Sequence, residues 1–128
     1  MRRRHTPRLR QRSRLERRRD AAAVSINRLT LDARLVARGD LRFTPAGIPV
    51  LDMQLAHESM QVEAGSERRV ACELAAVALG PIARQLAGIA IGSRLRCDGF
   101  LARRYRTGIS VALHLCEFEV NDYVTEGN

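Results

Sequence analysis

Hydrophobic and polar residues alternate along five stretches of the chain, with the two-residue period of strands that bury one face. These stretches are Leu29–Leu35, Leu51–His57, Arg69–Val77, Leu95–Leu101 and Ile109–Leu115. Each is bounded by segments rich in glycine, proline or polar residues, which is typical of strands joined by turns. The pattern predicts a protein built mainly of β-strands.

The last two stretches predict a hairpin that spans Gly92–Val120. Ile109, Val111, Leu113 and Leu115 are expected to share the inward face of its second strand. The connecting loop contains three arginines and one tyrosine and ends at Gly108, a residue suited to the positive φ that hairpin loops often need. Such a loop offers cations for phosphates and a ring on which a base can stack.

One short helix interrupts the strands. Pro81 suits the first turn of a helix, and Ile82, Leu86 and Ile89 follow at helical spacing, so we expect a helix over Pro81–Ala87. The polar segment Gln61–Arg68 is expected to be the tip of a hairpin between the second and third strands.

This order, with the helix between strands three and four, predicts a five-stranded OB-fold, a small Greek-key barrel. In this fold the ligand lies across strands two and three, between the loop that joins strands one and two and the loop that joins strands four and five. The first loop contains Arg38, Arg42 and Phe43, and the second contains Arg103–Arg106. Each places arginine beside an aromatic ring.

Charge is distributed unevenly over the 128 residues. Residues 1–20 contain 10 arginines and two acidic residues, a net charge of +8, whereas residues 21–128 contain 12 of each sign and are neutral. We expect residues 1–25 to be a disordered arginine-rich extension, 26–121 to be the OB-fold domain and 122–128 to be a polar tail. The extension is open to three interpretations: a nucleic-acid-binding arm, an organellar transit peptide, or a product of an upstream start codon. A start-codon product or a dispensable arm is favoured.

Nothing in the sequence predicts an enzyme, a cofactor or a metal site. Cys72, Cys97 and Cys116 have no metal-binding or redox spacing and alternate with apolar residues, so we expect buried free thiols in a reducing cytoplasm. His57 and His114 stand alone in strands and are expected to be structural. No stretch is long and apolar enough to predict a membrane span or a signal peptide.

Several segments resemble bacterial single-stranded-DNA-binding proteins and their shorter relatives, the primosomal replication protein N family. The resemblance begins at Asn27–Leu31 and continues through Phe43-Thr44-Pro45-Ala46-Gly47-Ile48-Pro49. It extends through Gln61–Gly65, Ile91–Leu95 and Gly99–Leu101 to the last strand. One member of the family has aromatic residues where this chain has Ala71 on strand three and Ser66 before it. Their loss is expected to weaken base stacking.

The resemblance implies a non-enzymatic, homodimeric protein of replication restart that binds single-stranded DNA and bridges the primosomal helicase to the helicase-loading factor. Two alternatives stay open: a protein-interaction scaffold with incidental DNA affinity, and a general single-stranded-DNA-binding protein. The candidate DNA-binding residues are Arg42, Phe43, Arg68, Arg103, Arg104, Tyr105 and Arg106.

Overall fold

The computed structural model describes residues 13–14 and 25–121, and the N-terminal and C-terminal segments predicted to be disordered or tail-like lie almost entirely outside this range. Six strands and one helix make up the described fold. They are β1 (Leu29–Arg38), β2 (Arg42–Phe43), β3 (Pro49–Glu63), β4 (Ser66–Leu79), α2 (Pro81–Ala87), β5 (Arg94–Arg103) and β6 (Val111–Val120).

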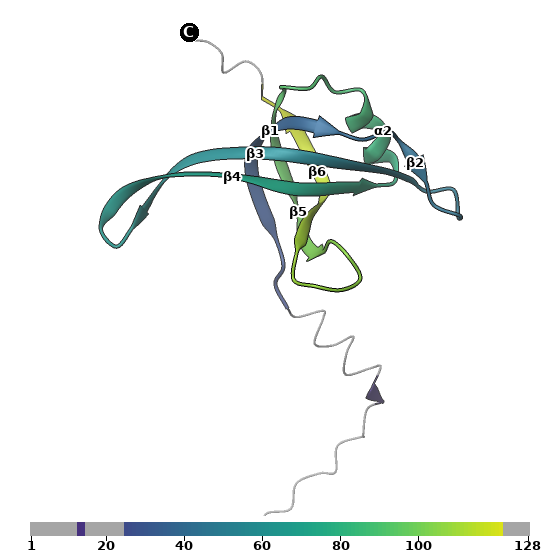
Figure 1. Cartoon of the computed structure of the whole chain (residues 1–128), viewed down its shortest axis with the longest axis horizontal. Coiled ribbons are helices and arrows are strands. Elements are labelled where there is room, and N and C mark those ends of the chain that lie inside the picture. The colour runs from purple at the N-terminus through teal and green to yellow at the C-terminus, as the bar shows by residue number, and fades with distance from the viewer. Residues whose placement is uncertain (1–12, 15–24, 122–128) are drawn as a thin grey trace, which may run out of the picture.

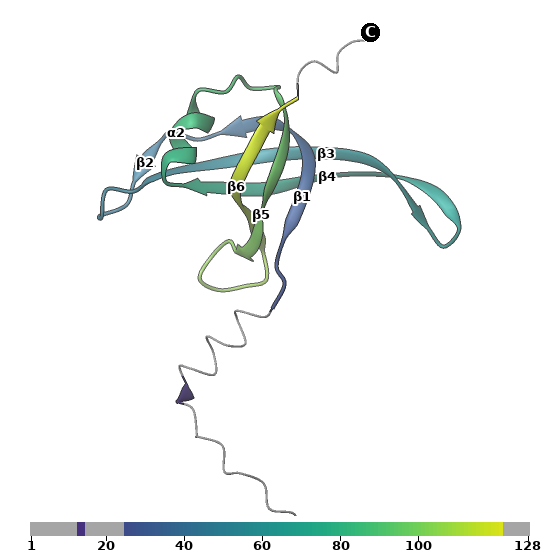
Figure 2. The ribbon, with the colours of Figure 1, turned by 180° about the vertical axis from the view of Figure 1, so that it is seen from behind.

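Five of the strands close into a barrel (Figures 1 and 2). The sheet has the order β1-β5-β6-β4-β3-β2, and an additional pairing of β1 with β3 closes it. Every pairing is antiparallel except that of β4 with β6, which is parallel and joins Ala76 to Leu113 and Val77 to His114. With α2 between β4 and β5, this is the predicted OB-fold.

Alternating side chains of the five strands fill the barrel interior. The fully buried large side chains are Leu35, Leu51, Leu55, Leu86, Leu95, Leu113 and Cys97. Leu86 comes from α2, which covers one end of the barrel and packs against β3 and β4. The predicted bounds of this helix are confirmed, with Pro81 in its first turn and Gly88 at its C-terminal cap. Burial of this apolar surface supplies the main driving force for folding.

The strands β3 and β4 form a hairpin arm that projects well beyond the barrel (Figure 1). The expectation that Gln61–Arg68 forms the tip of a long hairpin is confirmed, and most of the segment is paired strand, because the ladder continues to Glu63 and Ser66. The turn itself is only Ala64 and Gly65, with φ of 54° and 81°. Two successive positive φ values are the geometry of the tight hairpin turns that match strand twist.

Two expectations need correction. The first loop contains a short strand, β2, which pairs Arg42 with Val50 and Phe43 with Pro49. The last strand begins only at Val111, so Ile109 lies in the loop and is 96% exposed, and Val111 is exposed as well. The register of β6 against β5 shifts between Asp98 and Gly99, which a strictly alternating pattern cannot predict.

Candidate nucleic-acid interface

The β5–β6 loop (residues 104–110) and the adjoining end of β5 hold four of the predicted site residues. The backbone N–H of Arg104 donates to the carbonyl of Ser110 at 2.8 Å and narrows the base of the loop. The Arg103 guanidinium donates to the carbonyl of Arg106 at 2.5 Å, and the Arg104 guanidinium lies 5.0 Å from the centre of the Tyr105 ring. Gly108 has a φ of 93°, as its position predicted.

Among the residues that the structure describes, no acid forms an ion pair with Arg103, Arg104 or Arg106. All three are exposed, and Tyr105 is 58% exposed. Their guanidinium groups are therefore available to an anionic ligand, and Arg can contact a phosphate with two parallel hydrogen bonds.

The first loop places Arg42 and Phe43 on β2, at a different part of the barrel (Figure 1). Arg42 forms an ion pair with Asp52 at 2.9 Å, so its charge is already balanced. Phe43 is not part of the core, because the residue is 51% exposed and the guanidinium of Arg84 lies 5.4 Å from the centre of its ring. The structure therefore offers an exposed ring in this loop and a new cation, Arg84, from α2.

The remaining predicted residue, Arg68, lies on the hairpin arm away from both loops. It forms an ion pair of 2.5 Å with Glu63 across the turn, and its neighbour Arg69 pairs with Glu58 at 2.7 Å. Exposed pairs of this kind contribute little to stability, but each one offsets the charge that a phosphate would meet. The structure thus does not bring Arg68 together with the other predicted residues.

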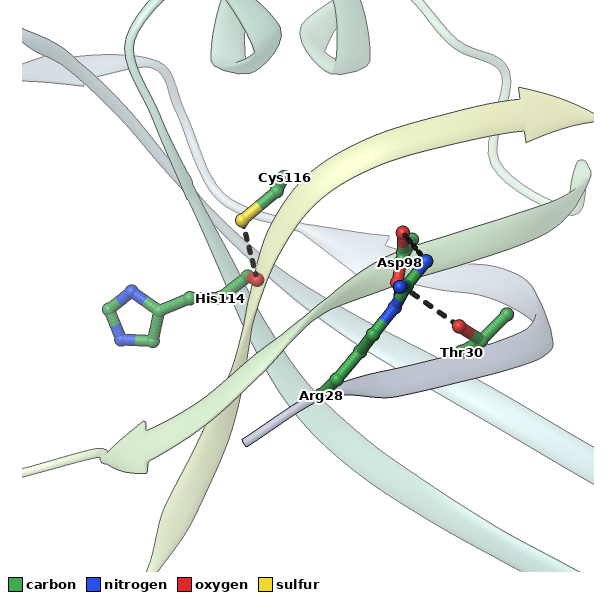
Figure 3. Close-up of polar contacts among 5 residues, drawn as sticks. All are labelled: Arg28, Thr30, Asp98, His114 and Cys116. Carbon is green, nitrogen blue, oxygen red and sulfur yellow. Dashed lines mark hydrogen bonds and ion pairs between the residues drawn. The ribbon is translucent and has the colours of Figure 1, made fainter. Parts of the chain in front are cut away.

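Arginine and aspartate also pair across β1 and β5. The Arg28 guanidinium bonds both carboxylate oxygens of Asp98, and the Thr30 hydroxyl donates to the same carboxylate at 3.1 Å (Figure 3). These hydrogen bonds, with Arg28 first, hold the pKa of Asp98 below its ordinary value. Arg96 pairs with Asp32 at 3.0 Å in the same way. The arginine and aspartate charges on this side of the barrel therefore neutralise each other.

The expectation for His57 is confirmed, whereas the expectation that all three cysteines are buried is wrong for two of them. His57 is structural as predicted, because its Nδ1 lies 2.6 Å from the Asp32 carbonyl oxygen and its Nε2 lies 2.8 Å from the Ser59 hydroxyl. Of the three thiols, only Cys97 is buried. Cys72 and Cys116 are exposed, because Cys72 lies at the base of the arm and Cys116 at the register shift in β6.

One aromatic contact was missed by the reasoning from sequence. The rings of Phe100 on β5 and His114 on β6 are stacked, with centres 5.0 Å apart and planes 12° from parallel. Phe100 is 39% exposed on the outer surface of the barrel. The available signal was the alternation itself: Phe100 lies between the inward positions Gly99 and Leu101, so its ring had to point outward.

A cleft of about 880 Å³ lies between β1, β5 and the base of the arm and is lined by residues that include His57, Cys72 and Glu73. None of the predicted site residues lines it. Among the residues that the structure describes, no group of three or more His, Cys, Asp or Glu side chains could hold a metal ion. No helix in the described part of the chain is long and apolar enough to cross a membrane.

A small closed OB barrel, with an exposed cationic loop and exposed rings on its surface, defines the class of protein: an OB-fold protein of the nucleic-acid-binding type. Residues 27–117 match the family described as "Another single-strand binding protein family". The chain belongs to this single-strand-binding protein family, whose members here are DNA-binding proteins rather than enzymes.

Individual relatives agree with this assignment. The chain is 46% identical to the replication restart protein PriB of Bordetella pertussis over 90 residues, which cover 70% of this chain and 84% of the relative. The solved structure of PriB from Ralstonia solanacearum superposes with a TM-score of 0.70 at 38% identity, covering 75% of this chain and 98% of that one. The single-stranded-DNA-binding protein of Thermus aquaticus superposes with a TM-score of 0.62 at 26% identity, over 77% of this chain and 51% of that one.

Proposed function

We propose that this protein is an accessory factor of replication restart that binds single-stranded DNA through its OB-fold domain, residues 26–121. The relatives named as replication restart and single-stranded-DNA-binding proteins support the process and the ligand. The observation that carries the proposal is the β5–β6 loop, with Arg103, Arg104 and Arg106 exposed and outside every ion pair among the described residues. Phe43, Arg42 and Tyr105 complete the proposed contact surface, and Arg68 is proposed as a separate contact on the hairpin arm.

The DNA affinity that this surface supports is modest. Five arginines of the domain, Arg28, Arg42, Arg68, Arg69 and Arg96, are engaged by carboxylates. Single-strand affinity falls with salt by about 0.7 log units per log unit for each phosphate neutralised. Phosphate contacts from Arg103, Arg104 and Arg106 alone therefore correspond to a slope of about two.

The proposal includes a homodimer and two protein partners in the cytoplasm. Residues Leu29–Ala33 of β1 pair with β5 on one side, while pairing with β3 on the other side begins only at Arg34. Apart from the Asp32 carbonyl, which lies 2.6 Å from Nδ1 of His57, this edge of β1 has no ladder partner among the described residues and can pair with a second copy of the chain. By its kinship with replication restart proteins, the dimer is proposed to bridge the restart helicase to the helicase-loading factor.

A triple Arg103/Arg104/Arg106→Ala variant tests the DNA-binding site. We expect it to bind labelled oligo-dT at least tenfold more weakly than the wild type in fluorescence anisotropy, with a smaller salt slope, because three phosphate contacts are lost. The matched control is the corresponding Arg→Lys triple variant, which keeps the charge and should keep most of the salt slope. Equal affinity and slope for the alanine variant would refute this site.

The same titration with a chain that begins at Ser25 separates the barrel from the arginine-rich extension. We expect the shortened chain to retain salt-dependent binding through the β5–β6 loop. Complete loss of binding would assign the DNA affinity to residues 1–24 and contradict the proposal for the barrel.

A second candidate function is favoured by the neutralised charges of the domain. A barrel in which five arginines form ion pairs is suited to a protein-interaction scaffold in which DNA affinity is incidental. Capture of the helicase by the alanine triple variant, at a salt concentration that abolishes oligo-dT binding, would support this candidate. Loss of capture together with DNA binding would count against it.

A further inference from the structure

The outer surface of β5 and β6 presents two stacked rings, which we call the ring pair, Phe100 and His114. They are directly opposite each other in the β5–β6 ladder, and their ring centres lie 5.0 Å apart. Neither ring takes part in the buried core, and Phe100 is 39% exposed. Figure 3 shows the His114 ring extending away from β6, with none of the other four labelled side chains beside it.

The backbones of β5 and β6 approach each other closely beneath the ring pair. A Cβ placed on Gly99 would lie 1.9 Å from the carbonyl oxygen of His114, a distance that no side chain can tolerate. The thiol of Cys116 donates to the same carbonyl at 3.6 Å (Figure 3). Gly99 therefore allows β5 and β6 to approach just where the two rings meet, and the register shift at Asp98/Gly99 sets Phe100 opposite His114.

The ring pair lies next to β4 on one side and is followed along β5 by the β5–β6 loop with its arginines. On one side, His114 pairs with Val77 of β4, which in turn pairs with Asp52 of β3. Along β5 and β6 the next pair on the same face is Ala102 and Ala112, of which Ala102 is half-buried and Ala112 is buried, and the loop begins two residues later. Small side chains thus separate the rings from the arginines by about 13 Å of strand, measured from Phe100 to Arg104 at 3.3 Å per residue.

We propose that the ring pair is a base-stacking platform for single-stranded DNA, on which a base rests while Arg104 and Arg106 hold the phosphates beyond it. This inference rests on the proposed function and deepens it by giving the bases a binding site. An aromatic surface accepts any base, because every base has a π face. The platform offsets the absence of aromatic residues at Ser66 and Ala71 on the arm.

A structural pair would behave differently from a platform. Cross-strand aromatic pairs stabilise a sheet whether or not a ligand is present. A platform, in contrast, discriminates between DNA that carries bases and an abasic strand of the same length and charge. The two roles are therefore separated by changing the ligand rather than the protein alone.

The test compares Phe100→Leu with the wild type, using oligo-dT and an abasic oligonucleotide of equal length. We expect Phe100→Leu to weaken oligo-dT binding roughly tenfold, within the range known for loss of one base stack, and to leave abasic binding unchanged. The matched control is Leu101→Ala, because Leu101 is similarly exposed, at 36%, but points to the opposite face. That control should leave both affinities unchanged.

A third variant supplies a direct readout of stacking. The chain contains no tryptophan, so Phe100→Trp introduces a single indole at the platform. We expect this variant to bind oligo-dT at least as tightly as the wild type and to lose fluorescence on binding. Unchanged fluorescence at saturation would overturn the proposal, as would equal weakening of both oligonucleotides by Phe100→Leu or weakening of neither. A wild type that binds neither oligonucleotide would instead refute the proposed function.

Discussion

Cys97 differs from the other two thiols in burial and ionisation. Burial inside the barrel, with a smaller effect from Asp32, raises the pKa of Cys97 to about 11. Its thiol is therefore both inaccessible and protonated at pH 8, whereas Cys72 and Cys116 are exposed. Because the thiolate is the reactive form, the three residues should differ in their reaction with alkylating agents.

We predict that iodoacetamide at pH 8 modifies Cys72 and Cys116 of the folded protein within minutes and leaves Cys97 unmodified. Peptide mapping by mass spectrometry identifies the sites, and the same reaction in denaturant, where all three should react, is the control. Modification of Cys97 at the rate of the exposed thiols would contradict its burial inside the barrel.

Single residues were the least predictable part of this protein. The alternation of the strands correctly placed Cys97 inward, but the same rule placed Cys72 inside, where the hairpin arm has no core to face. The partners of Arg42 and Arg68 are across-strand carboxylates, whose identity depends on register rather than on sequence proximity. The Phe100–His114 contact also depends on register, and it joins residues 14 positions apart.

The β5–β6 hairpin depends on the close approach of its strands at one glycine. Replacing Gly99 with alanine would force the His114 backbone to move, since the new Cβ would meet its carbonyl oxygen at 1.9 Å. We predict a loss of about 1–3 kcal/mol of unfolding free energy, measured by urea denaturation. The ring pair would separate as well, so oligo-dT binding should weaken.

A second alanine variant controls for the general effect of replacing glycine. A Cβ added at Gly39 would meet no atom within 4 Å, and Gly39 has no positive φ, so Gly39→Ala should change stability by less than about 1 kcal/mol. Equal losses of unfolding free energy in the two variants would show that the close approach of β5 and β6 does not exclude a side chain at Gly99.

Element order was predictable because each strand has one face against the barrel core. The sequence pattern predicted five strands and the bounds of α2, and the structure confirms them. Strand ends were less predictable. Beyond Ser59 and before Val70 the arm is exposed on both faces, so no alternation distinguishes its paired residues from a loop.

In the described part of the chain, Leu29–Ala33 of β1 has no ladder partner on the side opposite β5, and the proposed dimer pairs two such edges. We predict that the wild type sediments as a dimer and that Thr30→Arg, which brings two added cations together near the two-fold axis, shifts it towards monomer. The control, Gln61→Arg, adds the same charge on the exposed arm and should leave the dimer intact. A dimer that is insensitive to Thr30→Arg would place the interface elsewhere.

The parallel pairing of β4 with β6 is short. Only two residue pairs join these strands in the ladder, far fewer than join β3 to β4, and one of the two contains His114. The proposed base-binding surface consequently lies beside one of the shortest strand pairings of the barrel. A bound DNA strand that contacts residues beside this short ladder would stabilise the folded barrel by mass action, so DNA binding should raise the resistance of the protein to unfolding.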